Sequence, residues 1–188
     1  MISTNDLRSG VVIEVDGVLY RILEAQHVKP GKGSAFVRVR MRRLSDGATI
    51  ETTFRAGEKV KQAYLEGKDM QYLYNDGDMY YFMDTHTYDQ VGLPTEIVGD
   101  AAKFMKEDTI VRIYYYEGKP LSIELPTFVE LEVVDTDPGL RGDTAAGGSK
   151  PATLETGAVV QVPLFIKIGD ILKIDTRTGE YVERVRSK

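Results

Sequence analysis

The stretch Val11–Leu23 reads VVIEVDGVLYRIL, and its pattern sets the expected fold class. Two apolar runs flank Asp16-Gly17. A two-residue Asp-Gly loop between such runs is a strong hairpin signal, because both central positions of a type I′ turn need positive φ. A second turn at 45–47 separates the runs 36–44 and 49–54. Four strands within about fifty residues, with no helix between them, predict a small SH3-like barrel.

Short strands and turns continue along the rest of the chain. Strands are expected at 70–74, 79–83, 109–116, 121–125, 129–134, 159–162, 171–174 and 181–185, with one short amphipathic helix at 97–105 and a glycine-rich loop at 137–151. Strands around a single helix are typical of an OB barrel. The sequence therefore predicts an all-β protein of three small domains: an SH3-like domain at 1–64, an OB-like domain at 65–128 and a third domain at 129–188.

The composition excludes several classes of chemistry. The chain has 188 residues, no cysteine and only two histidines, His27 and His86. The lack of cysteine excludes disulfides, thiol nucleophiles and thiolate zinc or iron–sulfur sites. Residues 1–6 have no basic or apolar signal region, and the longest apolar stretch, 158–166, is far too short to span a membrane. We expect a cytoplasmic protein with no metal, no other cofactor and no membrane contact.

Charge is spread unevenly along the chain. Residues 1–64 carry 11 Lys and Arg against 7 Asp and Glu, a net charge of +4, whereas residues 65–128 carry 5 against 12, a net charge of −7. A basic first third points that third toward a polyanion, and the acidic remainder argues against non-specific coating of nucleic acid. Any nucleic-acid partner should be met through one end of the chain and a few defined loops.

A cationic turn joins two apolar strands of the first domain. It consists of Lys29, Pro30, Gly31, Lys32, Gly33 and Ser34. Pro30 fixes its own φ, and glycines on both sides of Lys32 allow positive φ. We expect a narrow hairpin tip with one long cationic side chain, that of Lys32, at its apex. The simpler interpretation is an ordinary exposed turn with a solubilising lysine.

Four arginines follow this turn. Arg38, Arg40 and Arg42 alternate with apolar residues, and Arg43 extends the cluster. Period-two geometry places the first three on one face of a strand, about 6.6 Å apart per step. That spacing is close to the reach between successive phosphates of an extended nucleic-acid backbone. The four arginines are candidate RNA contacts, and the alternative is the solvated face of a half-buried strand.

Two motifs resemble those of the bacterial elongation factor P family. The run 29–33, followed by Ala35-Phe36, is similar to that family's tip loop. The segment Lys150-x-Ala152-x4-Gly157-x2-Val160-x-Val162-Pro163-x2-Ile166-x2-Gly169 matches the family's C-terminal signature at every fixed position. The loop 142–145 also resembles the family's sequence there. By contrast, the chain has no phosphate-binding or other enzyme motif.

The resemblance implies three β-barrels in an L-shaped, tRNA-like arrangement, the first SH3-like and the other two OB-like. It implies a monomeric, non-enzymatic translation elongation factor that binds the 70S ribosome between the P and E sites, beside the P-site tRNA. Such a factor promotes peptide-bond formation and relieves stalling at consecutive prolines. By the same resemblance, Lys32 is the residue that dedicated enzymes modify covalently in many members. Gly142, Asp143 and Thr144 would reach toward the small subunit and the mRNA in the E site.

Three other interpretations stay open. One is a paralogous ribosome-binding factor of the same build with a different client. Another is an enzyme that uses Lys32 as a Schiff-base nucleophile, although such a lysine is usually desolvated. The third is a general OB-type RNA-binding protein, which the net charge of −5 disfavours.

Overall fold

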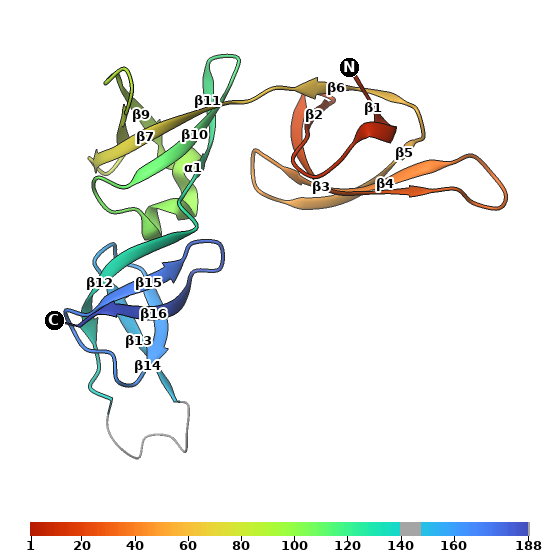
Figure 1. Cartoon of the computed structure of the whole chain (residues 1–188). Helices are drawn as coiled ribbons and strands as arrows, with labels where there is room; N and C mark the ends of the chain where they lie inside the picture. Colours follow the sequence, from red (N-terminus) through yellow and green to blue (C-terminus); the bar gives the residue numbers. More distant parts are fainter. Residues whose placement is uncertain (140–147, 188) are drawn as a thin grey trace. The chain divides into compact units, whose positions relative to one another are not determined.

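The computed structural model describes residues 1–139 and 148–187, and the regular secondary structure of these residues is mostly β-strand (Figure 1). Within these ranges, sixteen strands form three sheets, accompanied by one short α-helix and two 3-10 segments. The all-β prediction is confirmed. In the same ranges, no helix is long and apolar enough to cross a bilayer.

The first sheet runs in the order β1-β6-β2-β3-β4-β5. Its elements are β1 Ile2–Ser3, the 3-10 segment η1 Thr4–Asp6, β2 Val12–Val15, β3 Val18–Val28, β4 Phe36–Arg43, β5 Thr49–Arg55 and β6 Lys59–Ala63. The expected type I′ hairpin joins β2 to β3, since Asp16 and Gly17 have φ angles of 51° and 81°. The pattern did not predict β1 and β6, because each is short and contains few apolar residues.

One extra residue interrupts the pairing of β3 with β4. Glu24 pairs with Arg40, whereas the next regular pair joins Ile22 to Met41, so Leu23 forms a β-bulge. Because side chains alternate between the two faces of a strand, this extra residue changes which part of β3 faces outward.

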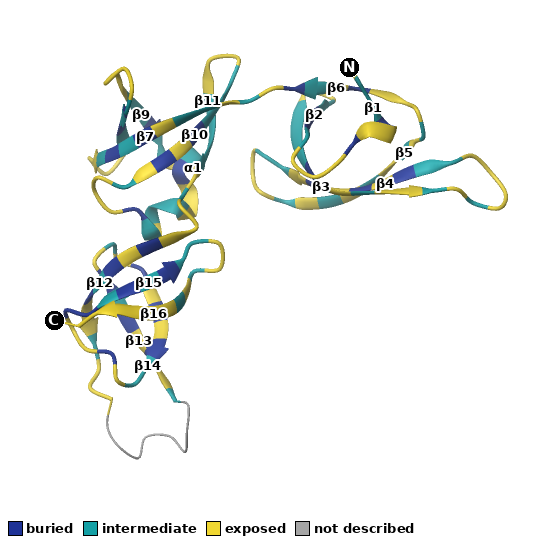
Figure 2. Cartoon of the chain, viewed as in Figure 1, coloured by how far each residue is buried: buried dark blue, intermediate teal, exposed yellow. Residues whose placement is uncertain are grey.

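The core of the first sheet lies on one side of β4. Val37, Val39 and Met41 are at most 2% exposed. They pack with Leu7, Ile13, Ile22 and Val60. Arg38 and Arg40, which alternate with them, are exposed, and Figure 2 shows this alternation along the strand. β4 therefore has one buried face and one face open to solvent.

The second sheet runs in the order β11-β10-β7-β8-β9. Its strands are β7 Glu66–Asn75, β8 Met79–Asp84, β9 Gln90–Pro94, β10 Ile110–Tyr116 and β11 Lys119–Glu124. The helix prediction needs correction, because one α-helical turn, α1 Thr95–Val98, leads into a 3-10 segment, η2 Gly99–Phe104. Gly99 has φ +55° and ends the α-helix after that turn. The expected apolar side remains, since Val98 and Met105 are buried.

The third sheet runs in the order β14-β13-β12-β15-β16. Its strands are β12 Phe128–Thr136, β13 Ser149–Leu154, β14 Val159–Pro163, β15 Ile171–Asp175 and β16 Glu180–Arg186. The loop expected at 137–151 ends earlier than predicted, because Ser149 to Pro151 pair with β14. Lys150 is only 6% exposed. β13 was not among the predicted strands, because a lysine at an inward position near its start does not fit a pattern of alternating apolar residues.

Packing divides the chain into two compact units. The first comprises residues 1–67 and 114–122, and the second comprises residues 68–113 and 123–188. The first unit contains the whole β3–β4 hairpin. In the second unit, Phe104 of η2 packs against the buried cluster of the third sheet.

Candidate functional site

The β3–β4 hairpin carries the predicted tip at residues 29–35. Lys32 lies at the centre of this loop, and Gly31, Lys32 and Gly33 are all exposed. Gly33 has φ +97°, whereas Gly31 does not adopt positive φ, so the expectation for the two glycines is correct for Gly33 alone. Within the described residues, the Lys32 side chain has no hydrogen-bond or ion-pair partner.

Backbone geometry and pairing at the base of the loop position this tip. The pair Val28–Phe36 closes the ladder between the two strands. The N–H of Ala56 donates to the carbonyl of Ala35 at 3.2 Å. A Cβ at Gly33 would lie 4.0 Å from Pro30 Cγ, an ordinary contact, so the backbone angle is what favours glycine there. The tip is therefore anchored at its base, and the Lys32 amine is left open to solvent.

Three of the four predicted arginines share the exposed face of β4. Arg38, Arg40 and Arg42 alternate with buried residues as expected. Arg40 Nη2 lies 3.6 Å from Glu24 Oε2, and the two side chains are 50% and 69% exposed. Such an exposed ion pair stabilises the fold by at most about 1 kcal/mol. In the described part of the chain, Arg38 and Arg42 have no carboxylate partner.

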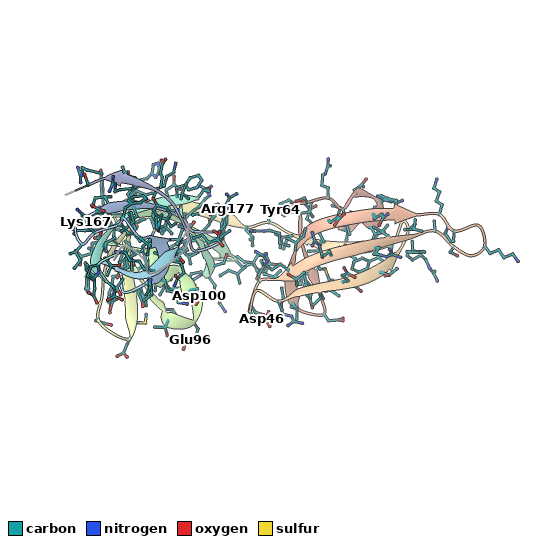
Figure 3. The ribbon with its side chains drawn as sticks, turned by 90° about the horizontal axis from the view of Figure 1, so that it is seen from below. Asp46, Tyr64, Glu96, Asp100, Lys167 and Arg177 are labelled. Atoms are coloured by element: carbon teal, nitrogen blue, oxygen red, sulfur yellow. The ribbon has the colours of Figure 1, made fainter. Side chains whose placement is uncertain are left out.

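Arg43 is held in a turn at the other end of β4 from the tip. Its Nη1 donates to Asp46 Oδ2 at 2.8 Å, and Figure 3 labels Asp46 at this end of the sheet. This hydrogen bond raises the pKa of Arg43, and a further one with Tyr20 adds to the effect. The N–H of Ala48 also donates to Asp46 at 3.0 Å and is the main cause of the lowered pKa of Asp46. The structure thus separates Arg43 from the other three arginines.

The acidic neighbours of Arg40 were not predicted from the sequence. Glu24 on β3 and Glu51 on β5 are its direct cross-strand partners. Counting back from the turn at 44–48 predicts the pairing with Glu51. Counting from the tip likewise predicts the pairing with Glu24, because the pairs from Val28–Phe36 to Glu24–Arg40 form one regular register. The bulge at Leu23 interrupts that count only beyond Glu24, so it conceals the pairing of Arg21 with Arg42.

Of the remaining predicted site residues, Lys29 and Ser34 are exposed and Pro30 is half-buried. Gly142, Asp143 and Thr144 lie outside the described residues. The residues that are described contain no group of three histidine or acidic side chains that could hold a metal ion.

Family models match all three parts of the chain. The model for the KOW-like domain of elongation factor P matches residues 3–60, the OB-domain model matches 65–123, and the C-terminal model matches 129–184. The chain belongs to the elongation factor P family. Its domain boundaries near 64 and 128 stay a prediction, although each family model ends or begins within a few residues of one of them.

Relatives over the full length support the same assignment. An elongation factor P from Coprothermobacter proteolyticus is 68% identical over 185 residues, covering 98% of this chain and 100% of that protein. An elongation factor P from Pelotomaculum thermopropionicum is 59% identical with the same coverage. Translation initiation factor 5A from Methanococcus jannaschii has a TM-score of 0.51 and 25% identity, covering 65% of this chain and 94% of that one. By family, the chain is a translation elongation factor.

Proposed function

We propose that this elongation factor P family member binds the 70S ribosome between the P and E sites. There it promotes peptide-bond formation when the ribosome stalls at consecutive prolines. The observation that carries the proposal is the Lys32 side chain, which is exposed at the centre of the hairpin loop and has no partner among the described residues. A cation that stabilises nothing in its own domain is available for a partner.

Positioning explains how such a tip would act. Proline is a constrained acceptor in peptidyl transfer, and it stiffens the nascent chain. A cationic side chain beside the acceptor end of the P-site tRNA can hold the reactants in a productive geometry. Orientation alone can lower a barrier by up to about 7–11 kcal/mol in ideal cases, so a small part of that is sufficient. The factor then accelerates the reaction by binding, without covalent chemistry of its own.

Lys32 is also the residue that we expect modifying enzymes to extend. An enzyme must reach the amine, and the exposed loop between β3 and β4 allows that access. A lysine that forms Schiff bases is usually desolvated, so the same exposure argues against the enzyme alternative. Mass spectrometry of the intact protein and of the peptide that contains Lys32, purified from its own cells, would identify any attached group.

The other proposed contacts follow the charge distribution. Arginines on the exposed face of β4 would contact phosphates of the P-site tRNA or of ribosomal RNA, since Lys and Arg neutralise phosphate charge. The acidic middle third would face basic ribosomal protein. Residues 142–144 would approach the mRNA in the E site. As a partner of translating ribosomes, the factor would act in the cytoplasm as a monomer.

Reconstituted translation tests this proposal. The rate of synthesis through three consecutive prolines is compared with the rate on a matched template without them, with and without the factor. We expect acceleration on the proline template and little change on the control. Ribosome binding without proline-specific acceleration would favour the paralogous factor with another client, and binding to free RNA as tight as to ribosomes would favour a general RNA-binding protein.

A further inference from the structure

Charges on the exposed face of the first sheet are arranged in rows across three strands. Each outward residue of β4 has a direct partner on β3 and another on β5. Side chains at directly opposed positions have Cβ atoms about 4.5–5.5 Å apart, so each row acts as one local charge. A row here is one outward residue of β4 with its partners on β3 and β5. The net charge of each row therefore indicates whether a phosphate would be attracted to the arginine at its centre.

The middle row is net negative. Arg40 lies between Glu24 on β3 and Glu51 on β5. Glu24 contacts the Arg40 guanidinium at 3.6 Å, and all three residues are exposed. The row thus has a net charge of −1, and an approaching phosphate would meet two carboxylates beside one guanidinium. Arg40 is a poor phosphate ligand in this setting.

The rows on both sides are positive. Arg38 lies between Gln26 and Thr53, which are both neutral. Arg42 lies between Arg21 and Thr49, so two arginines face each other directly. Like charges opposed across a sheet destabilise it, and a bound anion would remove that cost.

Arg21 keeps its own positive charge beside Arg42, although it contacts an aromatic ring. Its guanidinium carbon lies 5.4 Å from the centre of the Tyr114 ring, within the same compact unit. A cation–π contact orients a guanidinium but leaves its charge in place. The Arg42 row therefore keeps two positive charges.

We propose that Arg38 and Arg42 are the phosphate-binding arginines of this face, and that the row Glu24–Arg40–Glu51 excludes phosphate between them. Arg38 and Arg42 are four residues apart on one strand, or roughly 13 Å. That separation corresponds to about two phosphate steps of an extended RNA strand. The exposed face of β4 would thus bind two phosphates of one strand and leave the phosphate between them unbound. This inference rests on the ribosome binding proposed above.

Salt titrations of ribosome binding test the assignment. The labelled full-length chain is titrated with 70S ribosomes that carry P-site tRNA, over a series of KCl concentrations. Each lost phosphate contact should reduce the slope of log affinity against log salt by about 0.7–0.9. We expect that reduction for Arg38→Gln and for Arg42→Gln. Arg40→Gln should leave the slope unchanged. The double variant Glu24→Gln with Glu51→Gln should allow one more phosphate contact and steepen the slope by about 0.7–0.9.

Two matched variants separate charge from structure. Arg38→Lys keeps the charge and should keep the wild-type slope. Arg8→Gln removes an exposed arginine that lies outside the strands of the same unit and should also keep it. Repeating the titrations on ribosomes without tRNA identifies the source of the phosphates. A slope change that disappears there assigns them to tRNA, and one that persists assigns them to ribosomal RNA.

Several results would overturn the inference. It is wrong if Arg40→Gln flattens the slope as much as Arg38→Gln does, if neither Arg38→Gln nor Arg42→Gln changes the slope, or if the double glutamine variant does not steepen it. Each of these results would leave the proposed ribosome binding intact. Absence of wild-type binding would contradict the proposed function itself, and the inference with it.

Discussion

The ammonium group of Lys150 donates a hydrogen bond to the main-chain carbonyl of Ile166 at 2.6 Å, inside the third domain. It also donates to the carbonyl of Asp137. The lysine therefore joins the start of β13 to two loops that are distant in sequence. Its role is structural, although the same residue belongs to the family signature in the sequence.

Replacing Lys150 by methionine should destabilise the protein. Methionine fills the space of the lysine stem but leaves two carbonyls without their donor, and an unsatisfied buried polar group costs about 1–3 kcal/mol. Thermal unfolding should show a melting temperature lower by several degrees. The matched control is Lys167→Met, at an exposed position in the same sheet's connecting loop. Equal melting temperatures for the two variants would contradict the role of Lys150.

Replacing Lys32 by alanine should separate activity from stability. An exposed loop side chain contributes within about 0.5 kcal/mol, so the variant should unfold like the wild type. Its ability to accelerate synthesis through three prolines should fall strongly, because the tip cation is lost. Lys59→Ala, at an exposed lysine of the same unit, should keep both properties. Full activity of Lys32→Ala would show that the tip assignment is wrong.

The ionised carboxylate of Asp84 should make the stability of the protein depend on pH. Its Oδ1 accepts hydrogen bonds from the N–H groups of His86 at 2.7 Å and Thr87 at 3.1 Å, and these bonds lower the pKa of Asp84 below 3.8. The unfolded chain therefore binds this proton more readily than the folded one. The resulting stabilisation is fully present above about pH 3.8 and is lost as the pH falls through the lower, folded-state pKa.

Two substitutions make that effect measurable. Asp84→Asn keeps an accepting oxygen but loses the charge, so it should be less stable than wild type at pH 7, and the difference should shrink below about pH 3.8. Asp84→Ala lacks the oxygen as well and should be destabilised at every pH. Denaturant unfolding at a series of pH values measures both. A constant difference between wild type and Asp84→Asn down to pH 2 would refute this explanation.

The segment 142–144 should affect activity without affecting stability. Asp143 has the same sign of charge as phosphate, so its expected role is to accept hydrogen bonds from base edges or 2′-hydroxyls, with Thr144 as a hydroxyl partner. The double variant Asp143→Ala with Thr144→Ala should lower proline-dependent activity and melt like wild type. If it melts several degrees lower, and activity falls only with the folded fraction, the segment has a structural role instead.

Much of the fold is predictable because turns and alternation are local signals. The Asp16-Gly17 hairpin has the expected positive φ angles, and the alternation on β4 correctly predicts which side faces the core. The helix prediction fails at Gly99, because the 3.6-residue period persists through a backbone that is no longer α-helical. No strand was predicted at β13, where a buried lysine near its start does not look like a core residue.

The candidate site is harder to predict, because its electrostatics depend on which residues lie opposite each other. Arg38, Arg40 and Arg42 look equivalent along the chain. Only the cross-strand register shows that Arg40 lies between two glutamates, while Arg42 faces another arginine. Lys32, by contrast, stands out in the sequence because its neighbours are glycines and no carboxylate lies nearby.

The bulge at Leu23 determines which side chains of β3 share the exposed face. Arg21 and Glu24 are three positions apart, and they share a face only because one residue between them is unpaired. If Leu23 were paired in regular alternation instead, Glu24 would stay outside and Arg21 would turn inward. Deleting Leu23, by contrast, would leave Arg21 opposite Arg42 and Glu24 opposite Arg40. A relative with one residue fewer at this point of β3 would therefore present the same rows of charge without a bulge.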